Sequence, residues 1–201
     1  MDNPRTTTRA RRRGHARAAA PLLFALCLLT ALPALVPAQR TREHLTPEEI
    51  ELVRDNQVLD ARTGVFIKAA ERRLLAVTNP AEAAKTSAKD KEKWGEVKGT
   101  RAQLFYDISK ILDEAVVNVD DVAVHDPDSP LLRKSLFMLA QAAGRILPEL
   151  ARLRESVKEE AEADQLDRAL ETAKEIAEAA KERGVNAEDL KAKAKAAKKD
   201  N

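Results

Sequence analysis

The stretch LFYDISKILDEAVVNVDDV, residues 104–122, decides the fold class. Its apolar side chains recur at alternating steps of four and three, which places them on one face of an α-helix. The polar residues Asp107, Lys110 and Glu114 fall on the opposite side. We therefore expect an amphipathic helix that ends near His125 and buries one face against other helices. The apolar face consists of Leu104, Ile108, Ile111, Ala115, Val119 and Val122.

Three more amphipathic segments flank this one. The first begins at Thr46-Pro47-Glu48-Glu49, a capping box with proline at the first helical position, and its helix is expected to run to about Val77. Another is expected to begin at Pro130, and the last is an alanine-rich run that stops at Gly184. Because strand-forming patterns are almost absent, the sequence predicts an all-α protein. The expected architecture is an up-and-down bundle of about four long helices.

The expected helical domain spans residues 39–185 and contains one long polar connection, residues 79–99. This connection is rich in lysine and has two glycines, and we expect it to be ordered if Trp94 is buried. Residues 186–201 are predicted to form a short helix followed by a flexible, lysine-rich tail.

The first 38 residues have the pattern of a secretory signal peptide. Six arginines and one acidic residue precede an apolar run over residues 21–36, and small residues precede the polar boundary. The run is broken by Pro33 and Pro37 and is shorter than the roughly 20 apolar residues that span a bilayer. We expect cleavage after Ala38 and export to the periplasm or the outside of a bacterial cell. The alternative is an uncleaved membrane anchor that carries the same outward-facing domain.

Removal of this leader changes the charge balance of the chain. The whole sequence has 35 basic and 33 acidic residues, of which the leader holds six and one. The mature chain then keeps 29 basic and 32 acidic residues, a net charge near −3, which does not support nucleic-acid binding. Cleavage also removes Cys27, the only cysteine of the sequence. Disulfides and cysteine metal ligands are therefore not expected in the mature protein.

The sequence contains no catalytic motif. It has neither the Gly-x-Ser-x-Gly pattern of a serine nucleophile nor a glycine-rich phosphate loop. Its adjacent carboxylates, such as Asp120 and Asp121, point to different sides of a helix. We therefore expect a non-enzymatic protein that uses no cofactor.

Two aromatic residues are candidates for partner binding. Tyr106 falls opposite the apolar face of its helix, and Trp94 lies in the charged connection beside Lys93. Exposed aromatic residues near lysine or arginine are typical of protein contacts. In the alternative interpretation, the connection folds back and Trp94 covers one end of the bundle.

Glu114, Asp121 and His125 are the candidate metal ligands. Asp121 and His125 are four residues apart and share a helix face, and Glu114 lies further back on the same helix. Such a set could hold a divalent cation loosely. The alternative is a solvated helix end, where the helix dipole favours histidine.

The sequence thus predicts a binding or scaffolding component of the bacterial cell envelope, with a protein partner or with self-association. One alternative is a divalent-metal-binding bundle protein. The other is a surface-associated protein that is held by its tail, since residues 191–199 contain five lysines and no acid. Such a tail gives weak, salt-sensitive attachment to anionic lipid or wall polymer.

Overall fold

The computed structural model describes residues 42–185, which belong to one compact unit that begins at Arg42. These residues form α-helices and one short 3₁₀ helix, and there is no strand between residues 42 and 185. The predicted all-α class is therefore confirmed. The predicted signal peptide and the predicted tail, residues 186–201, lie outside the described residues. None of the helices described is both long enough and apolar enough to cross a membrane.

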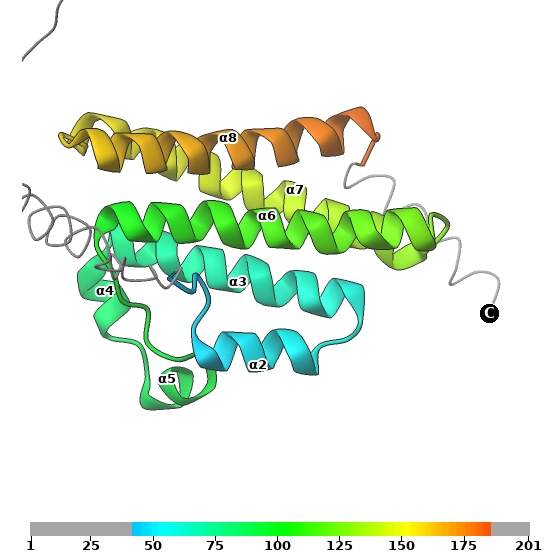
Figure 1. The fold of residues 1–201 in the computed structure, drawn as a ribbon, viewed down its shortest axis with the longest axis horizontal. Coiled ribbons are helices and arrows are strands. Elements are labelled where there is room, and N and C mark those ends of the chain that lie inside the picture. The colour runs from blue at the N-terminus through cyan, green and yellow to red at the C-terminus, as the bar shows by residue number, and fades with distance from the viewer. Residues whose placement is uncertain (1–41, 186–201) are drawn as a thin grey trace, which may run out of the picture. The chain divides into compact units, whose positions relative to one another are not determined.

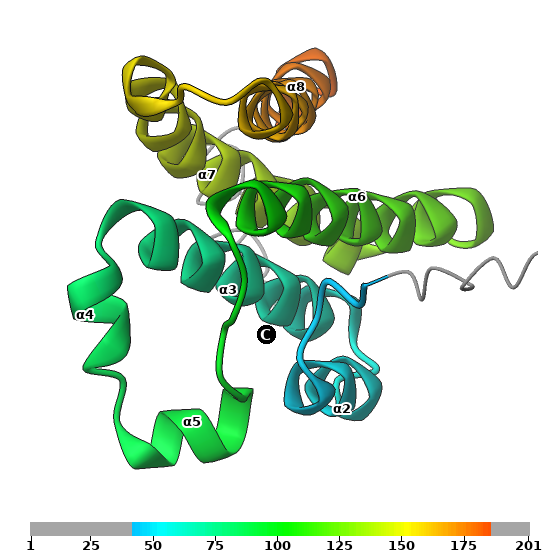
Figure 2. The same cartoon turned by 60° about the vertical axis from the view of Figure 1, so that its left-hand side comes forward.

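Four long helices make up most of the domain, and consecutive ones run in opposite directions (Figure 1). Helix α3 packs against α6 and α7, and α8 also packs against α6 and α7. The order around the core is therefore α3, α6, α8, α7. The domain consists of two antiparallel pairs, α3 with α6 and α7 with α8. The two pairs meet through the parallel neighbours α3–α7 and α6–α8 (Figures 1 and 2). The long helices are α3 (Leu59–Thr78), α6 (Arg101–His125), α7 (Pro130–Leu153) and α8 (Glu160–Glu182).

Shorter helices fill the connections. Helix α2 packs along α3, and α5 packs against α2. The predicted polar connection thus contains α4 and α5, and Figure 2 shows it as a loop that stands out beside α3 before the chain enters α6. The short elements are α2 (Pro47–Asp55), α4 (Pro80–Ala84), α5 (Ala88–Trp94) and the 3₁₀ helix η1 (Arg154–Ser156).

The first predicted helix is correct at both ends but wrong in its middle. Its capping box is present, since the Thr46 hydroxyl accepts the Glu49 N–H at 3.1 Å and the Glu49 carboxylate accepts the Thr46 N–H at 3.0 Å. The helix breaks after Asp55, however, where the Asn56 backbone N–H and side-chain amide both donate to the Leu52 carbonyl. Asn56 therefore satisfies the end of α2, and the chain begins α3 at Leu59.

The apolar face of α6 forms the centre of the core, as predicted. Five of its six residues are buried, and Val122 is partly buried. Burying each large apolar side chain contributes about 1.5–3 kcal/mol relative to leaving it exposed. Helix α8 presents small residues to this core, among them Ala169, Ala173 and Ala180, which lets the neighbouring helices approach closely.

Candidate functional site: a groove between α6 and α8

The seam between α6 and α8 is hollowed where α7 passes beneath it. A cavity of about 340 Å³ opens there, with charged residues at its edges. Val117 is 66% exposed although it belongs to the apolar lining. The apolar lining consists of Val116, Val117 and Val119 from α6, Leu136 and Leu139 from α7, and Ile176 and Ala179 from α8.

The same seam continues towards the start of α6. A smaller hollow of about 160 Å³ includes Tyr106 and shares Asp113, Thr172 and Glu175 with the larger cavity. The two hollows form one α6–α8 groove, which runs along α6 from Tyr106 to Asp120. At 1.5 Å per helical residue this distance is about 21 Å. The groove is polar at the Tyr106 end and apolar at the Val117 end.

Charged residues of both signs line the α8 side of this groove, namely Glu171, Glu175, Arg168 and Arg183. Between residues 42 and 185, neither Glu171 nor Glu175 has an ion-pair partner, whereas Asp113 lies 3.5 Å from the Lys110 ammonium. The Thr172 hydroxyl donates to the Asp113 carboxylate at 3.3 Å. Over the whole groove, four acids and three bases give a net charge of −1, which favours a positively charged neighbour. The acids are Asp113, Asp120, Glu171 and Glu175, and the bases are Lys110, Arg168 and Arg183.

Tyr106, one of the two predicted partner-binding residues, is half-buried on the groove wall. The Lys110 ammonium lies 5.9 Å from the centre of its ring. The sequence identified Tyr106 correctly as a residue outside the core face of α6. It could not identify Val117 as part of the same site, because the groove depends on which face of α8 meets α6.

Trp94, the other predicted residue, lies at the end of α5 and is half-buried. Its carbonyl accepts hydrogen bonds from the Thr46 hydroxyl at 2.7 Å and from the Arg72 guanidinium at 2.8 Å. The Arg72 guanidinium carbon is also 5.8 Å from the centre of the Trp94 ring. Trp94 therefore contacts α2 and α3, and it does not share a site with Tyr106.

A buried polar junction surrounds Trp94. Glu49 is completely buried, and its Oε1 atom lies 2.5 Å from Nη1 of Arg73 and also pairs with Arg72. Arg73 in turn donates to the His44 carbonyl at 2.7 Å, and Arg72 donates to the Gly95 carbonyl at 2.5 Å. These bonds join α2, α3 and the end of α5 into one unit. The only sequence signal for this junction is a pair of adjacent arginines inside an apolar helix.

The segment just before α2 covers the start of α6. Asp107, which the sequence places on the solvated face of α6, is buried there and pairs with the Arg42 guanidinium. Burial raises the pKa of the Asp107 carboxyl above its usual value, although Arg42 opposes this shift. Further along α6, the His44 ring nitrogen Nε2 lies 3.0 Å from Glu114 Oε1, without hydrogen-bond alignment. The expected solvation of Asp107 is thus wrong, because residues 42–45 pack over it.

The structure does not bring the three candidate metal ligands together. Glu114 faces His44, whereas His125 Nδ1 lies 3.4 Å from Asp121 Oδ1 on an exposed turn of α6. In the part of the chain that the structure describes, no three His, Cys, Asp or Glu side chains lie close enough to hold a metal ion.

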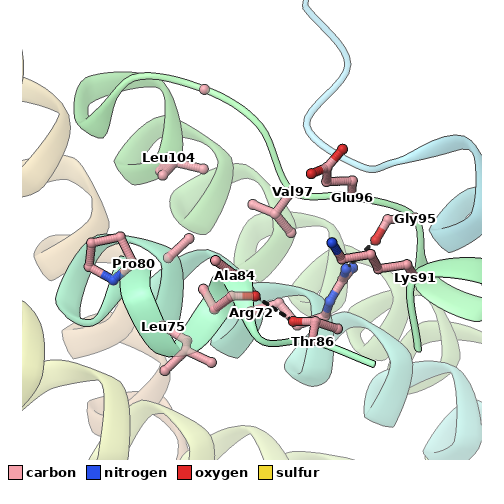
Figure 3. A pocket seen from close by; sticks show the side chains of 13 residues that line it. Arg72, Leu75, Pro80, Ala84, Thr86, Lys91, Gly95, Glu96, Val97 and Leu104 are labelled. Carbon is pink, nitrogen blue, oxygen red and sulfur yellow. Dashed lines mark hydrogen bonds between the residues drawn. The ribbon is translucent and has the colours of Figure 1, made fainter. Parts of the chain in front are cut away.

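A pocket of about 270 Å³ lies under the polar connection, between α3, α4, α5 and the chain that leads into α6 (Figure 3). Its wall includes Leu75, Pro80 and Val97. Arg72 also lines it, but both Nη atoms of Arg72 already donate to Glu49, Trp94 or Gly95. Since this charge is engaged within the chain, the α6–α8 groove is the stronger candidate for a binding site.

No family model, no curated protein and no solved structure matches this chain. Function is therefore inferred from the chemistry of the chain itself.

Proposed function

We propose that this chain is an exported, non-enzymatic binding protein of the bacterial cell envelope, which holds a partner protein in the α6–α8 groove. Export is inferred from the leader pattern of residues 1–38. Binding is inferred from one observation above all, the apolar lining that stays open between charged edges and includes the exposed Val117. In this proposal the four long helices act as an up-and-down bundle whose rigid core supports the groove.

The shape and charge of the groove favour a particular kind of partner. A groove of about 21 Å matches a helix of about 14 residues. Partner helices in such grooves insert apolar side chains at positions i, i+3, i+4 and i+7. Glu171 and Glu175 would attract lysine or arginine beside that apolar stripe. The proposed partner segment is therefore a basic amphipathic helix.

The test is a pull-down of the tagged full chain from native envelope, with mass spectrometry of bait and partner. Val117→Asp places a carboxylate on the apolar lining, and we expect at least about tenfold less partner, as for loss of an interface hot spot. Val124→Asp is the matched control, because Val124 is 77% exposed on the same helix and lies outside the groove lining.

Equal partner recovery with both variants, or recovery of bait alone, would overturn the proposed binding role. The N-terminus of the bait tests the expected cleavage after Ala38 in the same experiment. Tyr106→Ala should weaken binding less than Val117→Asp, since Tyr106 lies at the polar end of the groove. Trp94→Ala should instead lower stability, because it removes a half-buried ring that lies 5.8 Å from the Arg72 guanidinium carbon.

The two other functions that the sequence predicts have less support. A metal-dependent role for Glu114, Asp121 and His125 gains no support from geometry, since Glu114 faces His44 instead. Attachment through the lysine-rich tail concerns residues outside the described range.

A further inference from the structure

A second groove lies over the first turns of α7, next to the end of α8. Its volume is about 820 Å³. It is lined by the turn before α7, by seven residues of α7 between Leu132 and Gln141, and by Arg183 and Val185. We name it the α7 groove. Arg183 lines both grooves, so the end of α8 lies between them.

The α7 groove combines an apolar floor with basic edges. Leu132, Leu136, Phe137 and Met138 line it and are only partly buried. Three basic residues and one acid, Asp128, also line it. The basic residues are Arg133, Lys134 and Arg183.

Two of these basic residues have carboxylate partners elsewhere. Lys134 pairs with Asp60, and Arg183 lies 3.6 Å from Asp120. Arg133, by contrast, has no ion-pair partner between residues 42 and 185. The groove therefore offers an apolar surface next to a guanidinium group that can pair with a carboxylate.

The turn at the end of α8 directs the chain into this groove. Gly184 has φ +62°, a left-handed conformation that suits glycine, and the Val185 N–H donates to the Ala180 carbonyl at 3.0 Å. This turn places Val185 in the groove lining. The next five residues are Asn186, Ala187, Glu188, Asp189 and Leu190.

We propose that residues 186–190 of the same chain occupy the α7 groove, with Leu190 on the apolar floor and the carboxylates of Glu188 and Asp189 beside Arg133. Length permits this placement in either conformation, because Val185 already lines the groove. Residues 186–190 would span about 7.5 Å in the predicted short helix or about 17 Å if extended, and the α7 part of the lining is about 14 Å long. Charge favours it as well, because both acids precede the first lysine of the tail, Lys191.

The α6–α8 groove is the competing site for this segment, but its charge is less suitable. Four acids and three bases line it, whereas one acid and three bases line the α7 groove, so the charge balance favours the α7 groove for Glu188 and Asp189. The tail and a basic partner helix are thus directed to different grooves on the two sides of Arg183.

Disulfide trapping in the full chain tests this proposal. Cys27→Ser removes the natural cysteine, and Lys191→Cys is then combined with Gln141→Cys in the α7 groove or with Val117→Cys in the α6–α8 groove. Neither cysteine of the first pair replaces an apolar floor residue. Under mild oxidation we expect the Gln141 pair to close at least about tenfold faster, because docking raises its effective concentration. Equal rates, faster closure at Val117, or disulfides only between copies would overturn the proposal.

A charge reversal provides the second arm of the test. Arg133→Glu should slow closure of the Gln141 pair several-fold, and the added change Asp189→Arg should restore it. Arg152→Glu on the exposed side of α7 is the control and should change nothing, because Arg152 pairs with Glu149 outside the groove. An Arg133→Glu variant that crosslinks at the original rate would refute the charge contact and with it the proposed placement.

Discussion

Glu49 both caps the start of helix α2 and neutralises the charges of two arginines. One carboxylate oxygen accepts the Thr46 N–H at the start of α2, and the other pairs with Arg72 and Arg73 of α3. Removing two guanidinium groups and a carboxylate from water is costly, so the cluster adds little net stability compared with apolar residues of the same size. Breaking it from one side leaves buried charge without a partner.

We therefore expect Glu49→Gln to lower the free energy of unfolding by about 3–5 kcal/mol at neutral pH, the range for breaking a buried ion pair. Urea denaturation followed by circular dichroism measures this loss. Glu71→Gln is the matched control, because Glu71 pairs with the exposed Arg145 at 2.7 Å and should cost no more than about 1 kcal/mol. Equal losses of stability in the two variants would show that removing the Glu49 charge does not leave a costly unpaired charge in the interior.

For single residues, the sequence predicted helix caps but not the partners of buried polar side chains. The capping role of Glu49 follows from its position three residues after Thr46. Its contacts with Arg72 and Arg73 do not, because they join residues more than 20 positions apart. Asp107 illustrates the same limit, since helical periodicity alone gives it a solvated face.

Among elements, α3 and α7 are joined by the ion pair between Asp60 and Lys134. The Lys134 ammonium donates to the Asp60 carboxylate and holds the pKa of Asp60 below its usual value. A lowered pKa means that the folded state favours the ionised carboxylate. The stabilisation is therefore present above the usual carboxyl pKa and is lost as the pH falls through the lowered one.

Asp60→Asn should accordingly cost up to about 1 kcal/mol near pH 7, the upper end for an ion pair with one exposed member, and progressively less as the pH falls below the usual carboxyl pKa. Urea midpoints of wild type and variant across this pH range test the prediction. Asp167→Asn is the control, since Asp167 and its partner Arg154 are both largely exposed, and it should have little effect at any pH. A constant difference between wild type and Asp60→Asn at all pH values would contradict the ion-pair origin.

The boundaries of the long helices were predictable because caps and breakers mark them. Helix α6 ends at His125, α7 begins at Pro130 and α8 ends before Gly184, as expected. The break between α2 and α3 was not predictable, because apolar spacing continues across it and a single Asn56 ends the helix. Helices α4 and α5 have only five and seven residues, too few for periodicity to identify them.

Across the whole domain, the sequence predicted apolar faces and alternating directions but not the order of helices around the core. That order places α8 beside α6, and the α6–α8 groove exists only for this reason. An amphipathic pattern predicts which face of a helix is buried, but it does not predict which neighbouring helix packs against that face. The position of Tyr106 outside the core face of α6 could therefore be predicted, whereas the places of Val117 in the α6–α8 groove and of the α7 groove could not.

The two antiparallel pairs that form the core are linked in the chain only by residues 126–129, most of which are exposed. A cut in this turn leaves both helices of each pair on one fragment. The contacts between the pairs are side-chain contacts, which need no covalent link. The two pairs therefore resemble the two subunits of a heterodimer, joined here by a short peptide turn. Fragments cut between Asp126 and Pro127 should reassemble on mixing, with a melting temperature that rises with concentration, as circular dichroism would reveal. If the mixed fragments stay unfolded, the covalent turn is required for folding. If they reassemble, the contacts between the two pairs are sufficient to form the domain.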